Sequence, residues 1–251
     1  MQYTLKKSLG QHFLKDEAIC KRIVDELQQD TFTQLVEVGP GGGALTKYLL
    51  HIPNVDFRAV ELDREKVQFL DQAYPSIRGK LINEDFLQME PPFEGAFTVV
   101  GNFPYNISTQ ILFKILDWKE QVPVVIGMFQ KEVAERAASK SGSKVYGVLS
   151  VLIQAYYNVD YLFDVPPESF NPPPKVMSGV IRLTRRDDVP AMSSERQFNL
   201  LVKTAFNQRR KTLRNAIRSL FEPEVLEDAF FNKRAEVLTV GDFAALTFKM
   251  R

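Results

Sequence analysis

The stretch Asn102-Phe103-Pro104-Tyr105, within GNFPYNIS at residues 101–108, follows the apolar run AFTVV. The side-chain oxygen of Asn102 and the backbone carbonyl of Phe103 could both accept hydrogen bonds from an amine. Pro104 would stiffen the turn, and the ring of Tyr105 could stack on a flat base. A simple turn is the alternative interpretation, because Gly, Asn and Pro also punctuate chains for local backbone reasons. The rest of the chain has to decide between the two.

A glycine cluster, Gly39 and Gly41 to Gly43 within VEVGPGGGALT, lies between an expected strand and an expected helix. Glycine lets the backbone turn tightly and approach a ligand closely. The next expected strand ends in VELD, where Glu61 could accept both hydroxyl hydrogens of a ribose. The third ends in NEDF, where Asp85 could accept a hydrogen bond from an adenine amine. Three successive strand ends therefore favour an adenosine-containing cofactor, without distinguishing a methyl donor from a nicotinamide.

The Asn102 to Tyr105 stretch does distinguish them, because it ends the fourth expected strand, beside the reactive end of such a cofactor. An exocyclic adenine amine is a poor nucleophile, since its lone pair is delocalised into the ring, and two acceptors would help the nitrogen become tetrahedral. Stacking is worth about 1 to 3 kcal/mol per base, comparable to the few kcal/mol needed to extract a base from its helix. The stretch therefore favours methyl transfer to an adenine amine over a simple turn.

Short apolar runs alternate with helical segments along the first half of the chain, beginning with a helix that Asp16 could cap. This alternation predicts a parallel, doubly wound sheet covered by helices on both faces. Residues 148–165 and 178–185 are expected to be strands that close one edge, with PPESFNPPPK as a rigid loop between them. After the polar RRDDVPA only helical patterning follows. We therefore expect an α/β catalytic domain over residues 1–186 and a small helical domain over residues 187–251.

The composition narrows the class of protein further. The 251 residues carry 32 basic and 31 acidic side chains, so a polyanion would have to be met by a local patch. The single cysteine, Cys20, excludes an intramolecular disulfide framework, and His12 and His51 with it make a poor zinc set. No apolar run approaches the thickness of a bilayer. A cytoplasmic protein without a metal or a membrane is expected.

Taken in order, these motifs resemble those of the ribosomal RNA adenine dimethyltransferase family, the kasugamycin-sensitivity enzymes. The resemblance spans nearly the whole chain and is carried by KSLGQHFL, VEVGPGGGALT, VELD, EDF, GNFPYNIST, FQKEVAER, SFNPPPKVMS and FNQRRKTLRN. It implies a Rossmann-like S-adenosylmethionine-dependent methyltransferase fold. It also implies dimethylation of the 6-amino groups of two adjacent adenosines near the 3′ end of small-subunit (16S) ribosomal RNA, with a role in small-subunit biogenesis.

The same resemblance implies which residues form the site. S-adenosylmethionine would contact His12, Leu14, Gly39, Glu61, Asp85 and Asn102. The catalytic residues would be Asn102, Phe103, Pro104, Tyr105 and Phe170. Phe170 would be a second aromatic wall around the base, although a proline loop that packs a phenylalanine into the core is an equal alternative on composition. Family members often have Asn in place of His12, and Leu in place of Gly42 and of Phe103.

A basic segment from residue 203 to residue 218 contains no acidic side chain. If it is helical, Arg210, Arg214 and Arg218 share one stripe, and apolar residues form another that packs on the protein. A solvated basic face is the alternative. The residues expected to contact RNA phosphates are Arg209, Arg210, Lys211, Arg214 and Arg218, and the expected partner is ribosomal RNA in an immature small subunit, bound by a monomer.

Two other functions fit parts of these observations. One is an RNA-binding assembly factor that keeps the fold without turnover, which the intact glycine loop and NFPY stretch disfavour. The other is the related large-subunit methyltransferase, which shares the aromatic tetrad, whereas GPGGGALT and FNPPPKVMS favour the small-subunit enzyme.

Overall fold

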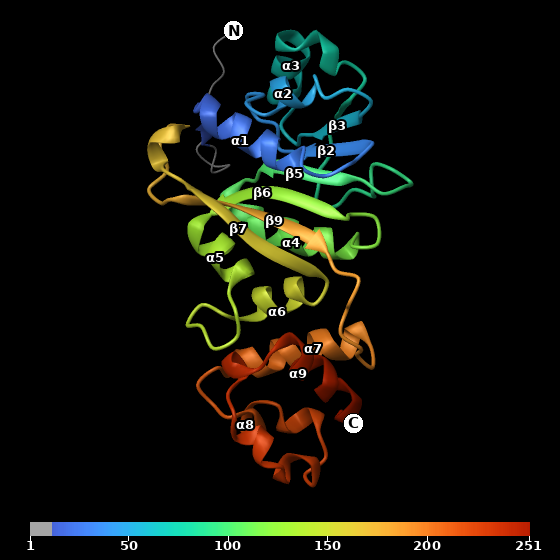
Figure 1. Cartoon of the computed structure of the whole chain (residues 1–251), viewed down its shortest axis with the longest axis vertical. Coiled ribbons are helices and arrows are strands. Elements are labelled where there is room, and N and C mark those ends of the chain that lie inside the picture. The colour runs from blue at the N-terminus through green and yellow to red at the C-terminus, as the bar shows by residue number, and fades with distance from the viewer. Residues whose placement is uncertain (1–11) are drawn as a thin grey trace. The chain divides into compact units, whose positions relative to one another are not determined.

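The computed structural model of the chain describes residues 12–251, so residues 7–11 of the KSLGQHFL motif lie outside the described part (Figure 1). The strands are β1 (Phe13–Leu14), β2 (Gln34–Val38), β3 (Asp56–Val60), β4 (Leu81–Ile82), β5 (Thr98–Asn102), β6 (Val124–Gln130), β7 (Tyr157–Val165), β8 (Phe170–Asn171) and β9 (Ser178–Arg185). The α-helices are α1 (Glu17–Leu27), α2 (Thr46–Leu49), α3 (Arg64–Ala73), α4 (Ser108–Asp117), α5 (Lys131–Ala138), α6 (Val148–Gln154), α7 (Glu195–Asn207), α8 (Leu213–Ala216) and α9 (Val240–Leu246). Short 3-10 helices are η2 (Pro75–Ile77), η3 (Tyr105–Ile107), η4 (Pro167–Ser169), η5 (Arg218–Leu220), η6 (Val225–Glu227), η7 (Ala229–Asn232), η8 (Ala235–Val237) and η9 (Thr247–Lys249).

Two compact units make up the chain. The first contains the residues up to 134 together with residues 160–185, and the second contains residues 135–159 together with residues 186–251. The chain passes from the first unit to the second for the last time after Arg185. The second unit takes in more of the chain than expected, because residues 135–159 group with it.

The main sheet has seven strands in the order β4-β3-β2-β5-β6-β9-β7. The strands from β4 to β6 in this order are parallel, and β9 pairs antiparallel with β6. The order reverses between β2 and β5, which are neighbours although β3 and β4 lie between them in the sequence. In a doubly wound sheet, ligands bind beyond the carboxyl ends of the strands at such a reversal. The prediction of a Rossmann-like α/β fold is confirmed.

Helix α1 forms where the sequence predicts a helix. The side chain of Asp16 caps it by accepting hydrogen bonds from the backbone N–H groups of Ala18, at 3.0 Å, and Ile19, at 3.3 Å. Its buried side chains recur at the spacing of one helical face and join the hydrophobic cluster formed with β2 and β3; they are Cys20, Ile23, Val24 and Leu27. The thiol of Cys20 is therefore part of the core.

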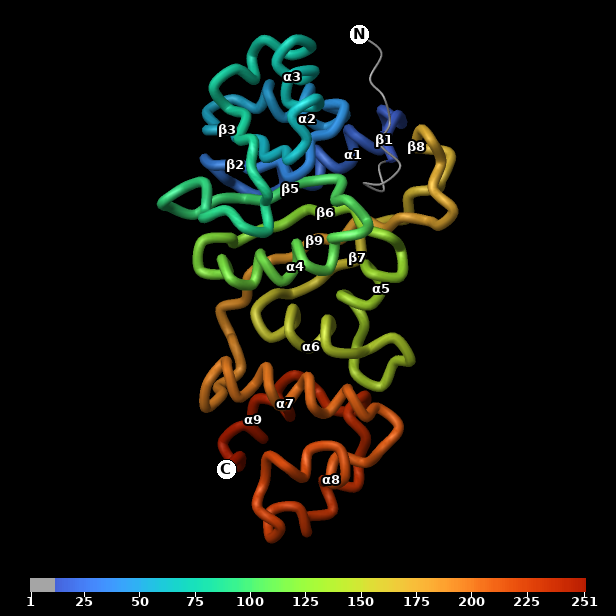
Figure 2. The backbone as a smooth tube through the Cα atoms, turned by 180° about the vertical axis from the view of Figure 1, so that it is seen from behind, coloured from blue at the N-terminus to red at the C-terminus, as the bar shows by residue number. Residues whose placement is uncertain are grey.

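Helices cover both faces of the sheet. Helix α1 lies in front of the sheet in Figure 1, and α4 lies in front of it in Figure 2, which is seen from behind. The residues of α4 that face the sheet, Ile111, Leu112 and Ile115, are fully buried. Ile115 follows Ile111 by four residues and Leu112 by three, which is the spacing of an apolar stripe on one helical face. This pattern explains why the segment packs as a helix.

A second, two-stranded sheet joins segments that are far apart in the sequence. Strand β1 pairs antiparallel with β8, with Phe13 opposite Asn171 and Leu14 opposite Phe170. The Nδ1 atom of His12 lies 2.8 Å from the carbonyl oxygen of Pro172. The proline-dense segment, predicted to be a loop, therefore contains a short strand that holds the beginning of the described chain.

One part of the predicted sheet is wrong. Residues 148–154 form helix α6, whereas the sequence analysis expected a strand there. The five residues 149–153 are all buried, Ser150 among them. A short run that is buried on every side has no period that separates a helix from a strand. Strands β7 and β9 do occupy the edge of the sheet, as expected.

The second unit is helical after residue 186, as expected, but its basic segment is not one helix. Helix α7 ends at Asn207, a turn follows, and α8 begins only at Leu213. The expected common stripe of Arg210, Arg214 and Arg218 therefore does not exist, because Gln208 already leaves the helical conformation. Leu213 is buried, as the expected packing requires.

Close packing around Gly127, in the middle of β6, yields a test of this fold. A Cβ atom at Gly127 would lie 2.4 Å from the ring of Phe103 and 2.6 Å from the ring of Phe129, and both rings are fully buried. We expect Gly127→Ala to lower the free energy of unfolding by about 1 to 3 kcal/mol, the usual cost of overpacking a core. Urea denaturation measures the loss.

Gly95→Ala is the matched control, because Gly95 is exposed and a new Cβ there would meet only the side-chain oxygen of Gln34, at 3.4 Å, an ordinary contact. Adding Phe103→Leu to Gly127→Ala should restore part of the stability, since leucine is smaller than phenylalanine. Equal stability of the two alanine variants would contradict the packing of Phe103 against Gly127.

Candidate functional site

A cavity opens beyond the carboxyl ends of β2, β3 and β5, where the glycine cluster, Glu61 and the Asn102 stretch come together. About 650 Å³ of space, including its open mouth, lies between the residues that line it. The residues of the sequence-based prediction that line it are His12, Leu14, Gly39, Glu61, Asn102, Phe103, Pro104 and Tyr105.

The glycine cluster turns the chain tightly from β2 towards α2. Gly39, Gly41 and Gly43 have φ angles of +68°, +58° and +85°, a region that favours glycine. A Cβ atom at Gly43 would lie 2.3 Å from the ring of Tyr74, so a side chain is also excluded there by contact. The cluster is therefore required by its backbone conformation, and it leaves an open rim of backbone on the cavity.

Glu61 lies at the end of β3 with its carboxylate buried in the wall of the cavity. Its Oε1 accepts a hydrogen bond from the N–H of Asp63 at 3.0 Å, and its Oε2 accepts one from the N–H of Gly41 at 3.3 Å. The Nζ of Lys66 lies 3.6 Å from Oε2, and only 9% of the Lys66 side chain is exposed. The lysine partly compensates a carboxylate that would otherwise be a buried, unpaired charge.

Asp85 lies in an adjoining hollow that shares Glu61, Lys66 and Pro104 with the cavity. Its Oδ1 accepts a hydrogen bond from the N–H of Leu87 at 2.9 Å. The apolar wall of the hollow is formed by Leu62, Leu87 and Ile107. Leu62 is 61% exposed, so its side chain is open to a ligand in this hollow.

The amide of Asn102 has a fixed direction. Its Nδ2 donates a hydrogen bond to the backbone carbonyl of His12 at 3.3 Å, across 90 residues of sequence. Within residues 12–251, its Oδ1 has no hydrogen-bond donor, and the residue lines the cavity. The oxygen, a pure acceptor, is therefore the atom of this amide left for a ligand.

The two aromatic residues next to Asn102 lie in different surroundings. The side chain of Phe103 is buried in the core, 4.9 Å from the ring of Phe129, so only its backbone can serve a ligand. Tyr105 is half-buried and lines the cavity, with its ring centroid 5.5 Å from that of His12. Only Tyr105 of the two presents a ring to the cavity.

Phe170 lies elsewhere. It is 1% exposed, belongs to the hydrophobic cluster with Leu14, and is outside the set of residues that line the cavity. The structure thus agrees with the alternative left open by the sequence, in which the proline-dense segment packs Phe170 into the core.

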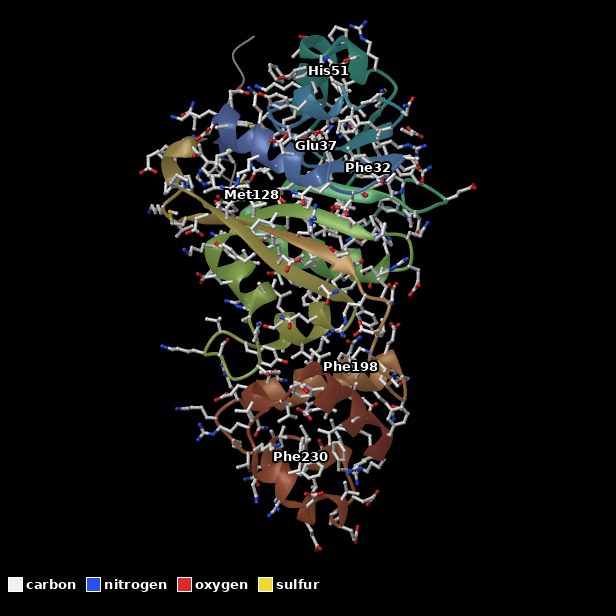
Figure 3. The ribbon with its side chains drawn as sticks, in the orientation of Figure 1. Phe32, Glu37, His51, Met128, Phe198 and Phe230 are labelled. Carbon is white, nitrogen blue, oxygen red and sulfur yellow. The ribbon has the colours of Figure 1, made fainter. Side chains whose placement is uncertain are left out.

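Glu37, on β2 behind the glycine cluster, was not singled out from the sequence (Figure 3). It is 2% exposed, and its Oε2 accepts a hydrogen bond from the hydroxyl of Thr46 at 2.6 Å. Burial raises the pKa of Glu37 to about 8, and the nearby charge of Glu61 adds to the rise. Glu37 is therefore mostly protonated at pH 7, which reduces the negative charge beside the cavity.

The basic residues of the second unit have different partners. The Nε of Arg209 lies 3.1 Å from a carboxylate oxygen of Glu236, and Arg214 donates a hydrogen bond to the carbonyl of Glu227 at 3.3 Å. Arg210 is exposed. Lys211 and Arg218 line one polar hollow together with Gln208 and Asn215. Arg210, Lys211 and Arg218 are thus the most available cations of the expected set.

In the part of the chain that the structure describes, no three His, Cys, Asp or Glu side chains gather as metal ligands would. Among the same residues, no helix combines the length and the apolar character needed to cross a membrane.

The fold is shared with solved structures. The crystal structure of a dimethyladenosine transferase from Plasmodium falciparum superposes with a TM-score of 0.77 at 23% identity, covering 92% of this chain and 94% of that one. The structure of the 23S rRNA methyltransferase ErmE gives a TM-score of 0.74 at 21% identity, with coverages of 95% and 99%. At these identities the likeness shows the fold.

Similarity in sequence shows a more specific relation. Residues 2–247 match the family described as ribosomal RNA adenine dimethylase. Ribosomal RNA small subunit methyltransferase A of Flavobacterium johnsoniae is 51% identical over 249 residues, covering 98% of this chain and 95% of the relative. The protein of the same name from Porphyromonas gingivalis is 46% identical over 257 residues, covering 100% and 99%.

The chain belongs to the ribosomal RNA adenine dimethylase family. The predicted family and the predicted enzyme class, an rRNA adenine dimethyltransferase, are confirmed.

Sequence reasoning missed Lys66, Glu37 and Leu62. Lys66 sits in the first turns of α3, where a lysine is ordinary, and no periodicity shows that its ammonium turns inwards to Glu61. Glu37 is an acidic residue in the mostly apolar strand β2, and this pattern could have indicated a buried carboxyl group. Leu62 follows Glu61 directly, but its exposure appears only in the folded chain.

The raised pKa of Glu37 predicts how stability depends on pH. Because the pKa is near 4.5 in the unfolded chain and about 8 in the folded one, the folded state binds more protons between these values. The contribution of Glu37 to the free energy of unfolding therefore falls as pH rises from 4.5 to 8. We expect Glu37→Gln, which keeps an oxygen for Thr46, to remove this fall, worth on the order of a few kcal/mol.

Urea denaturation of both proteins at a series of pH values between 5 and 8 measures the difference. The stabilities of wild type and variant should diverge as pH rises, with the variant the more stable at pH 8. Parallel curves across this range would show that Glu37 titrates normally.

Proposed function

We propose that the cavity binds S-adenosylmethionine and that the Asn102 stretch receives the 6-amino group of an adenine from small-subunit (16S) ribosomal RNA. Two adjacent adenosines near the 3′ end of that RNA would each be dimethylated. The single observation that carries the proposal is the orientation of Asn102, whose oxygen is left as an acceptor at the cavity. The name shared by relatives at about half identity supports the small-subunit target over the large-subunit one.

The residues present fit the cofactor. Glu61 has a carboxylate in the cavity wall that can accept the hydroxyl hydrogens of a ribose. The Oδ2 of Asp85, without a hydrogen-bond partner within residues 12–251, can accept the adenine amine, and Leu62 can cover the face of that adenine. Gly39, Leu14 and His12 border the rest of the molecule. S-adenosylmethionine supplies a methyl group on a positively charged sulfur, which an amine can accept directly.

The Asn102 stretch prepares the target amine. The Oδ1 of Asn102 and the backbone carbonyl of Phe103 accept its two hydrogens, so the nitrogen lone pair is drawn out of conjugation with the ring. These acceptors are preorganised, since the amide is held by His12 and the backbone by the end of β5. Tyr105 stacks on the base, and Pro104 stiffens the turn. Phe170 is left out of this stacking pair because its ring is in the core.

No protein nucleophile is needed. Burial raises the pKa of the Cys20 thiol to about 12, and the residue lies in the core, so it stays protonated and unreactive. The proton lost from the amine can pass to solvent. The second methyl addition requires the monomethylated amine to return to the same acceptors.

The partner in this proposal is the RNA of an immature small subunit, bound by one copy of the chain in the cytoplasm. Arg210, Lys211 and Arg218 would contact phosphates, which positions RNA without reading its sequence. Arg209 and Arg214 would contribute less than the sequence analysis expected, because both already have protein partners.

The test is methyl transfer to undermethylated small subunits from labelled S-adenosylmethionine, followed by mass spectrometry of the nucleosides. Wild-type protein should yield dimethyladenosine. Asn102→Ala should lower the rate by about 100-fold or more, because it removes a preorganised acceptor, while RNA binding stays within about twofold. Asn158→Ala, which removes an exposed amide on β7, is the control with normal activity.

Robust dimethyl product from Asn102→Ala would refute the role of this amide. If the wild-type protein bound RNA but gave no product, the result would favour the assembly factor. Label in large-subunit RNA would favour the related large-subunit activity.

The RNA surface has its own test. We expect Lys211→Ala combined with Arg218→Ala to weaken binding to small-subunit RNA and to reduce the slope of log affinity against log salt by about two, one for each phosphate that is no longer neutralised. Filter binding at several salt concentrations measures both. Arg196→Ala, an exposed cation at the start of α7, should leave the slope unchanged. An unchanged slope in the double variant would exclude the hollow as a phosphate site.

A further inference from the structure

The hydroxyl of Tyr105 is anchored at its far end. Its oxygen lies 2.5 Å from the Oγ of Ser178, the first residue of β9. Ser178 is fully buried, whereas Tyr105 is half-buried and lines the cavity. The two residues come from separate motifs, and the proposed function gives Ser178 no role.

Other contacts hold the same tyrosine from different directions. The ring of His12 lies 5.5 Å from the Tyr105 ring, with the planes tilted by 30°. His12 is itself held by the carbonyl of Pro172. The carbonyl of Tyr105 accepts a hydrogen bond from the hydroxyl of Ser108 at 3.1 Å. Backbone, ring face and ring tip are thus each fixed by a different segment.

The anchor at the ring tip decides the plane of the ring. A tyrosine on a fixed backbone still turns about two side-chain bonds, and a neighbour at one face does not stop the ring from swinging away from it. A hydrogen bond at the hydroxyl does stop it. Burial raises the pKa of Tyr105, so the phenol keeps its proton at neutral pH and the hydrogen bond persists.

We propose that Ser178 is a positioning residue for base methylation: by binding the Tyr105 hydroxyl, it fixes the ring plane on which the target adenine stacks. The inference rests on the proposed function, in which Tyr105 stacks on the base. Ser178 touches neither base nor cofactor. It acts by keeping the adenine amine in line with the Asn102 oxygen, where a displacement of about 1 Å costs up to 100-fold in rate.

A double-mutant cycle with Ser178→Ala and Tyr105→Phe tests this role. Ser178→Ala leaves the tyrosine hydroxyl without its partner, which costs more than removing both groups together. The ring then turns to find another partner. We expect Ser178→Ala to lower kcat on undermethylated small subunits at least tenfold. In the double variant the hydroxyl that drives the displacement is gone, so kcat should lie above that of Ser178→Ala alone.

Two further measurements separate positioning from loss of structure. Affinity for S-adenosylhomocysteine, by calorimetry, should stay within twofold of wild type in all variants, since the residues that bind the cofactor are unchanged. Ser150→Ala removes another buried serine hydroxyl, which donates to the carbonyl of Arg136 at 2.6 Å. This control should lose stability, as Ser178→Ala does, but keep its kcat when assayed below the unfolding temperature.

The outcomes are distinct. Wild-type kcat in Ser178→Ala, or effects of the two substitutions that simply multiply in the double variant, would overturn the inference while the proposed function stands. If Ser178→Ala does not fold, Tyr105→Phe breaks the same hydrogen bond from the other side, and its kcat at the wild-type level would overturn it equally. Failure of the wild type to bind S-adenosylhomocysteine or to transfer methyl groups would instead remove the proposed function.

Discussion

The hydrogen bond from the Asn102 amide to the carbonyl of His12 is the constraint on which the proposed chemistry of the site depends. An amide can present either a donor or an acceptor, and only the acceptor helps an amine become nucleophilic. By using the nitrogen within the protein, the fold leaves the oxygen for the ligand. The carbonyl of His12 is available at that place because the adjoining strand β1 is paired with β8. This strand pairing therefore determines that the Asn102 oxygen, and not the nitrogen, faces the cavity.

The charges around the cavity follow from burial. Two carboxylates, Glu37 and Glu61, lie close to each other in the wall, and the cost of burying both as anions is avoided in two ways. Glu61 is paired with Lys66 and bound by two backbone N–H groups. Glu37, which has only the hydroxyl of Thr46, keeps its proton. Glu61 thus has oxygens able to accept hydroxyl groups, and Glu37 acts as a neutral part of the scaffold.

Most of the fold could be predicted from the sequence, and so could several residues that line the cavity, whereas their roles stay predictions. The alternation of apolar runs and helical segments predicts a parallel sheet. The carboxyl ends of its strands are followed by the glycine cluster, Glu61, Asp85 and the Asn102 stretch. Two elements failed for local reasons. Residues 149–153 are all buried, so their pattern has no period that separates a helix from a strand. The basic segment looks helical throughout, but Gln208 leaves the helix before the next turn begins.

The sequence by itself determined which groups stand at the strand ends, because strand periodicity and glycine chemistry are local properties. Only the tertiary structure decided how those groups are used: that Asn102 turns its oxygen to the cavity, that Lys66 turns inwards to Glu61, that Phe170 goes to the core and that Ser178 meets Tyr105. Each of these contacts joins side chains through burial or a hydrogen bond that forms only when the chain closes on itself. Residue spacing along one segment carries no information about such partners.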